Sequence, residues 1–260
     1  MKNAIAVFAW MATSILVSEF LGYLLHRLLH SGKIGFLSRS HMKHHLVLYG
    51  PLQPQRPSSG YQDATTGELA LGNVGLEWLI PGAIVLGTSL LGLHFLHVAL
   101  LHQVVFVCTS LAWSFLMFSY LHDRMHIAGF WMERNRWLRF WFVAARRSHD
   151  IHHWALNDHG LMDKNFGIGF FFFDRLFRTH TSEWPVFNKR GYRAALLRFG
   201  DLLGRAIEGR EQQPVEVTKV VAQRNRTETA QAEAGSGLLG VVFRRWATRV
   251  CDQIPSGKIC

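Results

Sequence analysis

Ten histidines in four short clusters constrain the fold of this chain more than any other feature. The clusters follow the order HxxxH, HxxHH, HxxxH, HxxHH along the sequence. They contain His26 and His30; His41, His44 and His45; His122 and His126; and His149, His152 and His153. Residues three or four positions apart lie on one face of an α-helix, so each cluster directs two or three imidazoles toward one point. The spacing therefore predicts helices that converge on a common site.

Imidazole is the side chain that most often binds metal ions at neutral pH, and it suits iron, zinc, copper and nickel. One metal ion takes about four to six ligands, so ten converging histidines predict two metal ions. A single HxxxH pair is weak evidence, because chance and core packing also produce it. Four clusters in this alternating order are a strong indication of a metal site.

A second motif follows the last histidine cluster. The segment from Asp163 to Gly167 reads DKNFG, and the segment from Phe173 to Thr179 reads FDRLFRT. Together with the clusters, these segments resemble the fatty acid hydroxylase/sterol desaturase superfamily of integral-membrane di-iron oxidases and oxygenases, whose pattern here is DKN[YF]G…WDRLFGT. Phe173 stands where that family usually has Trp, and Arg178 stands where it usually has Gly. The resemblance covers residues 1–180, which we predict to be the catalytic domain.

The resemblance implies a chemistry and a set of partners. It implies hydroxylation or desaturation of a lipid, such as a fatty acyl chain or a sterol, by O2 at a non-haem di-iron centre whose ligands are the ten histidines. It also implies electrons from NAD(P)H, delivered by a ferredoxin or a cytochrome. The sequence contains no Gly-rich dinucleotide fingerprint, so we expect the reductase to be a separate protein.

Two alternatives stay open at this point. The first is a carotenoid hydroxylase, since that family also carries HD…H and HxxHH elements, although the DKNFG…FDRLF segment favours the sterol and fatty acid branch. The second is a non-catalytic membrane protein that binds zinc, because histidine ligands do not exclude zinc. Zinc is redox-inert, so an oxygenase requires iron, and metal content separates the two classes.

The distribution of charge predicts membrane spans. No Lys, Arg, Asp or Glu occurs in the 44 residues from Trp78 to Leu121. One span needs about 20 apolar residues, so this stretch predicts two spans in a hairpin whose tip lies between Gly87 and His102. Ala4–Leu25 predicts a further span. We therefore expect an all-α fold, a multi-pass helical bundle of about three spans.

The basic residues predict the orientation of that bundle. The formal net charge is +10, but the charge is concentrated after the first span and after the third. The basic residues are Arg27, Lys33, Arg39, Lys43 and Arg56, then Arg124, Arg134, Arg136, Arg139, Arg146 and Arg147. The positive-inside rule places both regions in the cytoplasm, and it predicts a cytoplasmic interfacial helical cap that holds the dimetal site. This placement argues against nucleic acid as a partner.

Five further residues are candidates for supporting the metal ligands. Metal-bound imidazoles usually donate their second N–H to a carboxylate or a carbonyl. Asp123 and Asp150 are adjacent to histidines, and His159 and Asn165 follow the last cluster. Glu19 lies inside the first span on the helical stripe of His26 and His30, and a carboxylate within a membrane indicates function by default. A helix cap for the aspartates and a packing hydrogen bond for Glu19 are the alternatives.

The remaining segments carry weaker predictions. Trp131–Trp141 combines aromatic and basic residues, which predicts an amphipathic interfacial helix. Residues 50–73 have the composition of a loop, which is either a lid over the site or a plain connector. His180 and the histidines of the hairpin tip, His94, His97 and His102, are expected at the surface. Residues 181–260 are predicted to form a polar linker and an amphipathic tail.

Overall fold

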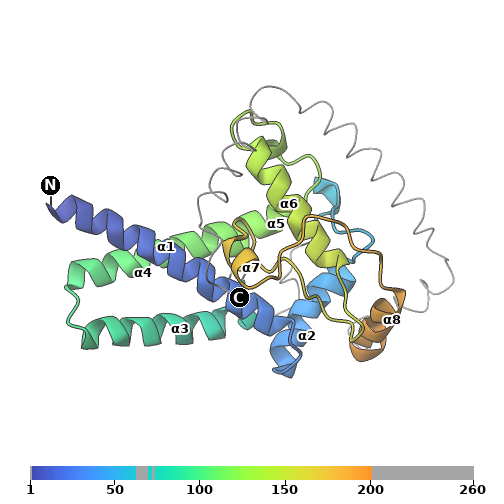
Figure 1. The fold of residues 1–260 in the computed structure, drawn as a ribbon, viewed down its shortest axis with the longest axis horizontal. Coiled ribbons are helices and arrows are strands. Elements are labelled where there is room, and N and C mark those ends of the chain that lie inside the picture. Colours follow the sequence, from blue (N-terminus) through green and yellow to red (C-terminus); the bar gives the residue numbers. More distant parts are fainter. Residues whose placement is uncertain (1, 63–69, 72–73, 201–260) are drawn as a thin grey trace, which may run out of the picture. The chain divides into compact units, whose positions relative to one another are not determined.

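The computed structural model describes residues 2–62, 70–71 and 74–200. Within them the fold is helical, except for one two-residue antiparallel ladder between β1 (Ala70–Leu71) and β2 (Val74–Gly75) (Figure 1). The α-helices are α1 (Lys2–Leu29), α2 (Gly35–Lys43), α3 (Leu76–Phe95), α4 (Leu100–Ser114), α5 (His122–Met125), α6 (Arg139–Trp154), α7 (Phe172–Leu176) and α8 (Lys189–Arg198). Short π-helices, η1 (His44–Leu48) and η3 (Phe115–Leu121), extend α2 and α4, and two 3₁₀ turns are η2 (Ser58–Gly60) and η4 (Trp131–Glu133).

Three of the described helical stretches are long and apolar enough to cross a membrane. They are Asn3–Leu29, Leu76–Phe95 and Leu100–Met125. The predicted all-α, multi-pass fold is therefore confirmed, and the chain is an integral membrane protein. The tip of the hairpin between α3 and α4 lies within the predicted interval, at residues 96–99. Helices are required in such spans because every backbone N–H and C=O must be paired inside the hydrocarbon layer.

The first and third spans pack closely against each other. Gly22 of α1 makes this possible, because a Cβ atom at that position would lie 2.0 Å from Cζ of Phe118. Farther along the same pair, the indole N–H of Trp113 donates to Glu19 at 2.7 Å. Small residues at helix contacts let membrane helices approach, and a polar pair adds a directional contact. The hairpin is therefore anchored to α1 mainly through its second helix.

The ends of the spans continue into a cap of shorter elements, residues 30–62 and 126–200. Two apolar clusters stabilise it. One joins α2 and η1 to α8 and contains Met42, Leu46, Leu156, Leu161, Met162, Ala195 and Phe199. The other joins η3 to α6 and contains Met117, Leu121, Met125, Phe142, Ala145 and Ile168. Three of the four histidine clusters lie on elements that these two apolar clusters hold together, and the first lies at the end of α1.

The predicted amphipathic helix over Trp131–Trp141 is wrong. The chain forms the 3₁₀ turn η4, and α6 begins only at Arg139. The side chain of Asn135 explains the break, because its Oδ1 accepts hydrogen bonds from the backbone N–H of Trp137 and of Leu138, at 2.9 and 3.1 Å. Such local side-chain bonds compete with the helical pattern and favour a helix start instead.

The C-terminal part of the chain is described only in part. Helix α8 packs on the turn that follows α6, where a Cβ atom at Gly191 would lie 2.2 Å from the carbonyl oxygen of Asn157. The predicted division of the chain at residue 180 stays a prediction. The predicted polar linker and amphipathic tail, over residues 205–250, lie outside the described residues.

We predict that Gly22→Val destabilises the helix bundle. The new side chain must displace the Phe118 ring, and overpacking of this kind costs about 1–3 kcal/mol. The measurement is the thermal unfolding midpoint of detergent-purified protein. Gly87→Val is the matched control, because a Cβ atom at Gly87 meets nothing within 4 Å. Equal midpoints for the two variants would contradict the proposed contact.

Candidate metal centre

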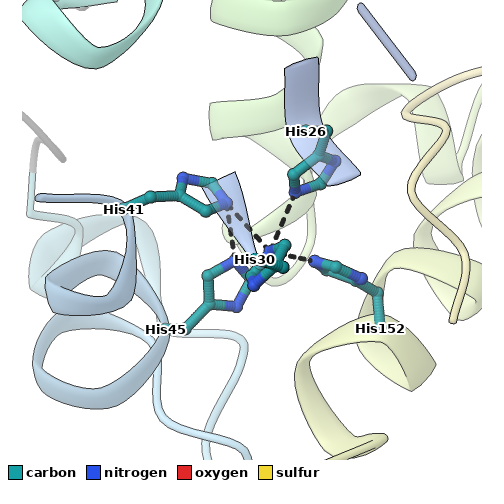
Figure 2. A group of neighbouring side chains, drawn as sticks. All are labelled: His26, His30, His41, His45 and His152. Carbon is teal, nitrogen blue, oxygen red and sulfur yellow. Dashed lines mark hydrogen bonds between the residues drawn. The ribbon is translucent and has the colours of Figure 1, made fainter. Parts of the chain in front are cut away.

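Five buried histidines from four separate elements meet at one point. Group A, as we call them, consists of His26, His30, His41, His45 and His152. Their potential ligand atoms all lie within 4.8 Å of one another, and Figure 2 shows the rings converging from α1, α2, η1 and α6. At most 3% of any of these residues is exposed, so water contributes little to the site.

Hydrogen bonding does not account for the geometry of group A. The Nε2 atom of His30 lies 3.3 Å from that of His26 and 3.0 Å from that of His152. The Nδ1–H of His26 donates to the carbonyl of Phe166, and that of His152 donates to the carbonyl of Lys164, both at 2.6 Å. A neutral imidazole carries one proton, so the Nε2 atoms of His26 and His152 present lone pairs. These lone pairs converge, as a bound cation requires.

A second group of four histidines, group B, repeats this arrangement. It consists of His44, His126, His149 and His153, which are buried and have their ligand atoms within 4.8 Å of one another. The Nε2 atom of His126 lies 3.0 Å from that of His44 and 3.1 Å from that of His149. The Nδ1–H of His126 donates to the carbonyl of Pro54, and that of His153 donates to the carbonyl of Tyr49. Carbonyl acceptors again direct Nε2 inward.

These distances fit nitrogen ligands around two metal ions. Two nitrogens at right angles, each about 2.1 Å from a metal, lie about 3.0 Å apart. The two groups are adjacent, since the ring centroids of His45 and His153 are 4.0 Å apart. The predicted dimetal site therefore corresponds to two neighbouring sets of donors.

His122 lies beside group B, but it is not among the four histidines whose ligand atoms all lie within 4.8 Å of one another. Its ring centroid is 4.8 Å from that of His149 and 4.9 Å from that of His44. Its Nε2 atom is buried and has no hydrogen-bond partner.

The chain order of the two groups shows an internal symmetry. Group A takes the pair His26 and His30, both outer histidines of the first HxxHH motif, and the middle one, His152, of the second. Group B takes the reverse set, with the middle histidine of the first HxxHH motif and both outer ones of the second. Of the second HxxxH pair, His126 belongs to group B and His122 does not. Only the addition of His122 would make the two groups symmetric.

The π-helix η1 helps one segment to serve both groups. It begins at His44, directly after α2, so that His41 and His45 face group A while His44 faces group B. A π-helical turn changes the angle between successive side chains and is frequent at functional sites. The reverse change, from π-helix to α-helix, occurs at His122, where η3 ends and α5 begins.

Burial keeps these imidazoles neutral. Loss of hydration lowers the pKa of His126 to about 3, although the hydrogen bond to Pro54 opposes the shift. Loss of hydration, and then the neighbouring histidines, also lower the pKa of His30 and of His45 well below the usual value. A metal ligand must be unprotonated, so protons compete weakly for this site at neutral pH.

The segment Asp163–Thr179, which contains DKNFG and FDRLFRT and which we call the clamp, orients two group A histidines. Asn165 has a positive φ of 54°, and its Nδ2 donates to the carbonyls of Ser148 and Thr181. The buried carboxylate of Asp174 accepts from the backbone N–H of Phe166 and of Gly167, each at 2.7 Å. These bonds hold the carbonyls on either side of Asn165 against His26 and His152. Asn165 therefore acts on the backbone that supports the histidines.

The loop after η1 supports group B in the same way. Besides the carbonyls of Tyr49 and Pro54, it provides Tyr61, whose hydroxyl donates to Asp123 at 2.8 Å, and Gln55, whose amide donates to Asp150 at 2.6 Å. Both aspartates are buried beside group B histidines in sequence. Residues 49–62 are thus part of the site.

Two predicted residues lie elsewhere than expected, and the role of a third, Glu19, stays a prediction. His159 is exposed in the turn after α6 and belongs to neither group, so its predicted supporting role is not reflected in its position. Glu19 bonds Trp113, which is the packing alternative, and its effect on activity stays a prediction. The expected surface position of His180 is wrong, since this residue is half-buried and its ring lies 3.1 Å from Asn165 Oδ1. The sequence feature that could have indicated this contact is the position of His180 directly after the FDRLFRT segment.

A cavity of about 700 Å³ leads to the histidines from between the spans. Residues of α1, α3, α4 and η3 line it, and most of them are apolar. At one end the lining includes His41 of group A, His44 of group B, and His122. Trp78 forms part of this wall, with its ring centroid 5.8 Å from that of His26. An apolar ligand in the cavity therefore reaches both groups.

Comparison with known proteins identifies one relationship. A family model described as "Fatty acid hydroxylase" matches residues 11–179 of the chain. The match extends from the first span to the last residue of the clamp. No curated protein matches the chain, and no solved structure matches it.

We predict that Arg178→Gly stabilises the protein. Helix α7 ends in a Schellman motif, in which the N–H of Thr179 bonds the carbonyl of Asp174 and Arg178 adopts a φ of +59°. A non-glycine residue in this conformation costs about 1 kcal/mol, so glycine should raise the thermal unfolding midpoint. Arg175→Gly, inside α7, is the control and should lower it. A lower midpoint for Arg178→Gly would mean that the Arg178 side chain contributes more than its backbone costs.

Proposed function

Because the chain belongs to the fatty acid hydroxylase family, we propose that it oxidises a lipid with O2 at two iron ions held by the ten clustered histidines. The family implies a lipid substrate and an oxidoreductase. The hydroxylation or desaturation of one particular substrate, the ten-histidine ligand set and the electron donor are our proposals.

The observation that carries this proposal is the contact between the cavity and both histidine groups. A lipid chain can leave the bilayer between the spans and stay in apolar surroundings until it reaches His41, His44 and His122. A metal storage or transfer protein has no need of such a path. The cavity thus supports an enzyme over the zinc-binding alternative.

The chain's own residues have three tasks in this reaction. Trp78 and Phe118, whose ring centroids are 5.8 Å apart, form a rigid wall that positions the lipid beside the histidines. The carbonyls of Phe166, Lys164, Pro54 and Tyr49 hold four imidazoles in the tautomer that presents Nε2 to the metal. The tight burial of both groups excludes bulk water from the reacting carbon.

Iron supplies the chemistry that no side chain can, which is the reductive use of O2 to break a C–H bond. Zinc would fit the same nitrogens but is redox-inert. We propose that electrons come from NAD(P)H through a separate reductase and a ferredoxin or cytochrome. The basic surface of the cap, with Arg134, Arg136 and Arg139 beside α6, suits an acidic carrier.

We also propose that the cap faces the cytoplasm. The segments that flank the cap ends of the spans are rich in Arg and Lys, whereas residues 78–121 carry no charge through the whole hairpin. This asymmetry is the pattern that the positive-inside rule describes.

We predict about two iron ions per chain in protein purified from iron-supplemented cells. His153→Ala removes a group B donor and should lower the content to about one or less, and His122→Ala should do the same if the symmetry argument holds. Metal analysis by mass spectrometry measures this, with the exposed His159→Ala as the matched control. Cells that produce the parent, but not His153→Ala, should contain a lipid that has gained an oxygen atom or lost two hydrogens. Stoichiometric zinc without any such lipid would refute the enzyme proposal.

We predict opposite labelling of the two ends of the spans. In a chain whose natural cysteines are replaced, Lys33→Cys at the cap end should react with an impermeant maleimide only from the cytoplasmic side. Leu96→Cys, at the exposed hairpin tip, should react only from the other side. Reaction of both from one side would show that the hairpin does not cross the membrane.

A further inference from the structure

A surface that is both basic and apolar lies where the first span enters the cap. Helix α7 packs there on α1, since the ring centroids of Phe20 and Phe173 are 5.1 Å apart and those of Tyr23 and Phe177 are 5.4 Å apart. Three arginines and four apolar side chains around this contact are exposed, and we call them the α1–α7 surface. They are Arg27, Arg175 and Arg178, with Leu24, Phe172, Leu176 and Phe177.

Contacts beneath this surface bring Arg27 beside the end of the clamp. Its guanidinium donates to the hydroxyl of Tyr23 at 3.5 Å, and that hydroxyl lies 3.2 Å from Oγ1 of Thr179. Thr179 directly follows Arg178, whose backbone N–H bonds the carbonyl of Arg175 at 3.3 Å. The three arginines therefore project from adjacent parts of two elements that are far apart in the sequence.

The positive charge of the α1–α7 surface is not neutralised within the described part of the chain. None of its three arginines forms an ion pair with a described carboxylate. Asp174 is buried, and its carboxylate accepts hydrogen bonds from two backbone N–H groups and from the hydroxyl of Thr179. The next carboxylate along the chain, Glu183, is exposed and pairs with none of them. The surface is therefore complementary to an anion.

The backbone of Arg178 indicates that its side chain acts outside the chain. Its φ of +59° lies in the left-handed region, which disfavours every residue with a side chain relative to glycine. The guanidinium makes no hydrogen bond, ion pair or ring contact with the described residues that would offset this cost. The C-terminal end of the α7 dipole accounts for a cation at Arg175, but Arg27 and Arg178 lie outside that helix.

The apolar part of the surface continues the lipid-facing side of the first span. Leu16 is 55% exposed and Leu24 is 40% exposed, as side chains that face acyl chains are. Arg27 lies in the last turn of that span, at the level where the head groups of a bilayer begin. Phe172 and Leu176 of α7 are each 59% exposed and extend the apolar face beside α1. Arginines thus meet apolar side chains at the membrane boundary.

We infer that the α1–α7 surface binds an anionic phospholipid, with the phosphate held by Arg27, Arg175 and Arg178 and the acyl chains packed on Leu24 and Phe172. Guanidinium groups present paired N–H donors that match phosphate oxygens. Solvated arginines would need no apolar side chains around them and no unfavourable backbone. The inference rests on the membrane-spanning fold and not on the proposed oxidation. A lipid bound here anchors the cap to the membrane next to the clamp.

The test adds lipid to the full-length, metal-loaded protein in detergent and follows the thermal unfolding midpoint. The probes are dioleoyl phosphatidylglycerol, which is anionic, dioleoyl phosphatidylcholine, which has the same chains without net charge, and inorganic phosphate. We expect phosphatidylglycerol to raise the midpoint at a lower concentration than phosphatidylcholine, and phosphate to leave it unchanged. Arg178→Gln should raise the half-maximal concentration of phosphatidylglycerol about fivefold, as expected for one cation lost beside an anionic lipid.

Three further variants separate this site from general effects of charge and backbone. Arg178→Lys keeps the charge at the same φ and should retain most of the preference for phosphatidylglycerol. Arg27→Gln, on the other helix, should weaken binding in the same direction as Arg178→Gln. Arg193→Gln is the matched control, because Arg193 is exposed on α8 and lies outside the surface, and it should change nothing.

Four results would overturn the inference. They are equal midpoints with the two lipids, an unchanged lipid preference in Arg27→Gln and Arg178→Gln, an equal loss of preference in Arg193→Gln, and stabilisation by inorganic phosphate alone. An acidic protein is the competing occupant. If Arg27→Gln and Arg178→Gln weaken the binding of a ferredoxin while the preference for phosphatidylglycerol persists, the surface is a docking site for the carrier and the inference is wrong.

Discussion

The convergence of unprotonated imidazole nitrogens in a dry interior is the constraint on which the rest of this structure depends. Nine buried histidines bring their donor atoms into two sets, and only a cation makes such a meeting of lone pairs favourable. Each ring must therefore be held in one tautomer. Backbone carbonyls do this for His26, His126, His152 and His153, and their positions dictate the course of the loop after η1 and of the clamp.

We propose that the membrane spans also bring a lipid substrate to this site. The cavity is bounded by helices that lipid surrounds, and it ends at histidines of both groups. Gly22 lets the first and third spans close on one side of the cavity, while α3 completes the other side. The histidines thus lie at one end of a mainly apolar cavity, and the helices that cross the bilayer also carry His26 and His122.

Much of this was predictable because it rests on periodicity and composition. The 44 uncharged residues predicted two spans, and the i, i+3, i+4 spacing of the histidines predicted helices. The prediction failed over Trp131–Trp141, where composition favoured an amphipathic helix and the side chain of Asn135 instead bonds the backbone and delays α6. It also misjudged His180, whose contact with Asn165, fifteen residues away, forms only when the segment between them folds back.

The sequence by itself predicted a helical membrane protein with a histidine site for two metal ions, because hydrophobic length and histidine spacing are properties of single segments. The tertiary structure alone decided which histidines share a position, where group A and group B each draw on both HxxHH motifs. It also decided which carbonyls orient the rings and which residues line the cavity. The physical reason is that every residue carries a carbonyl, so the choice of Phe166 or Pro54 as an acceptor leaves no mark in the sequence and is made only when distant segments pack together.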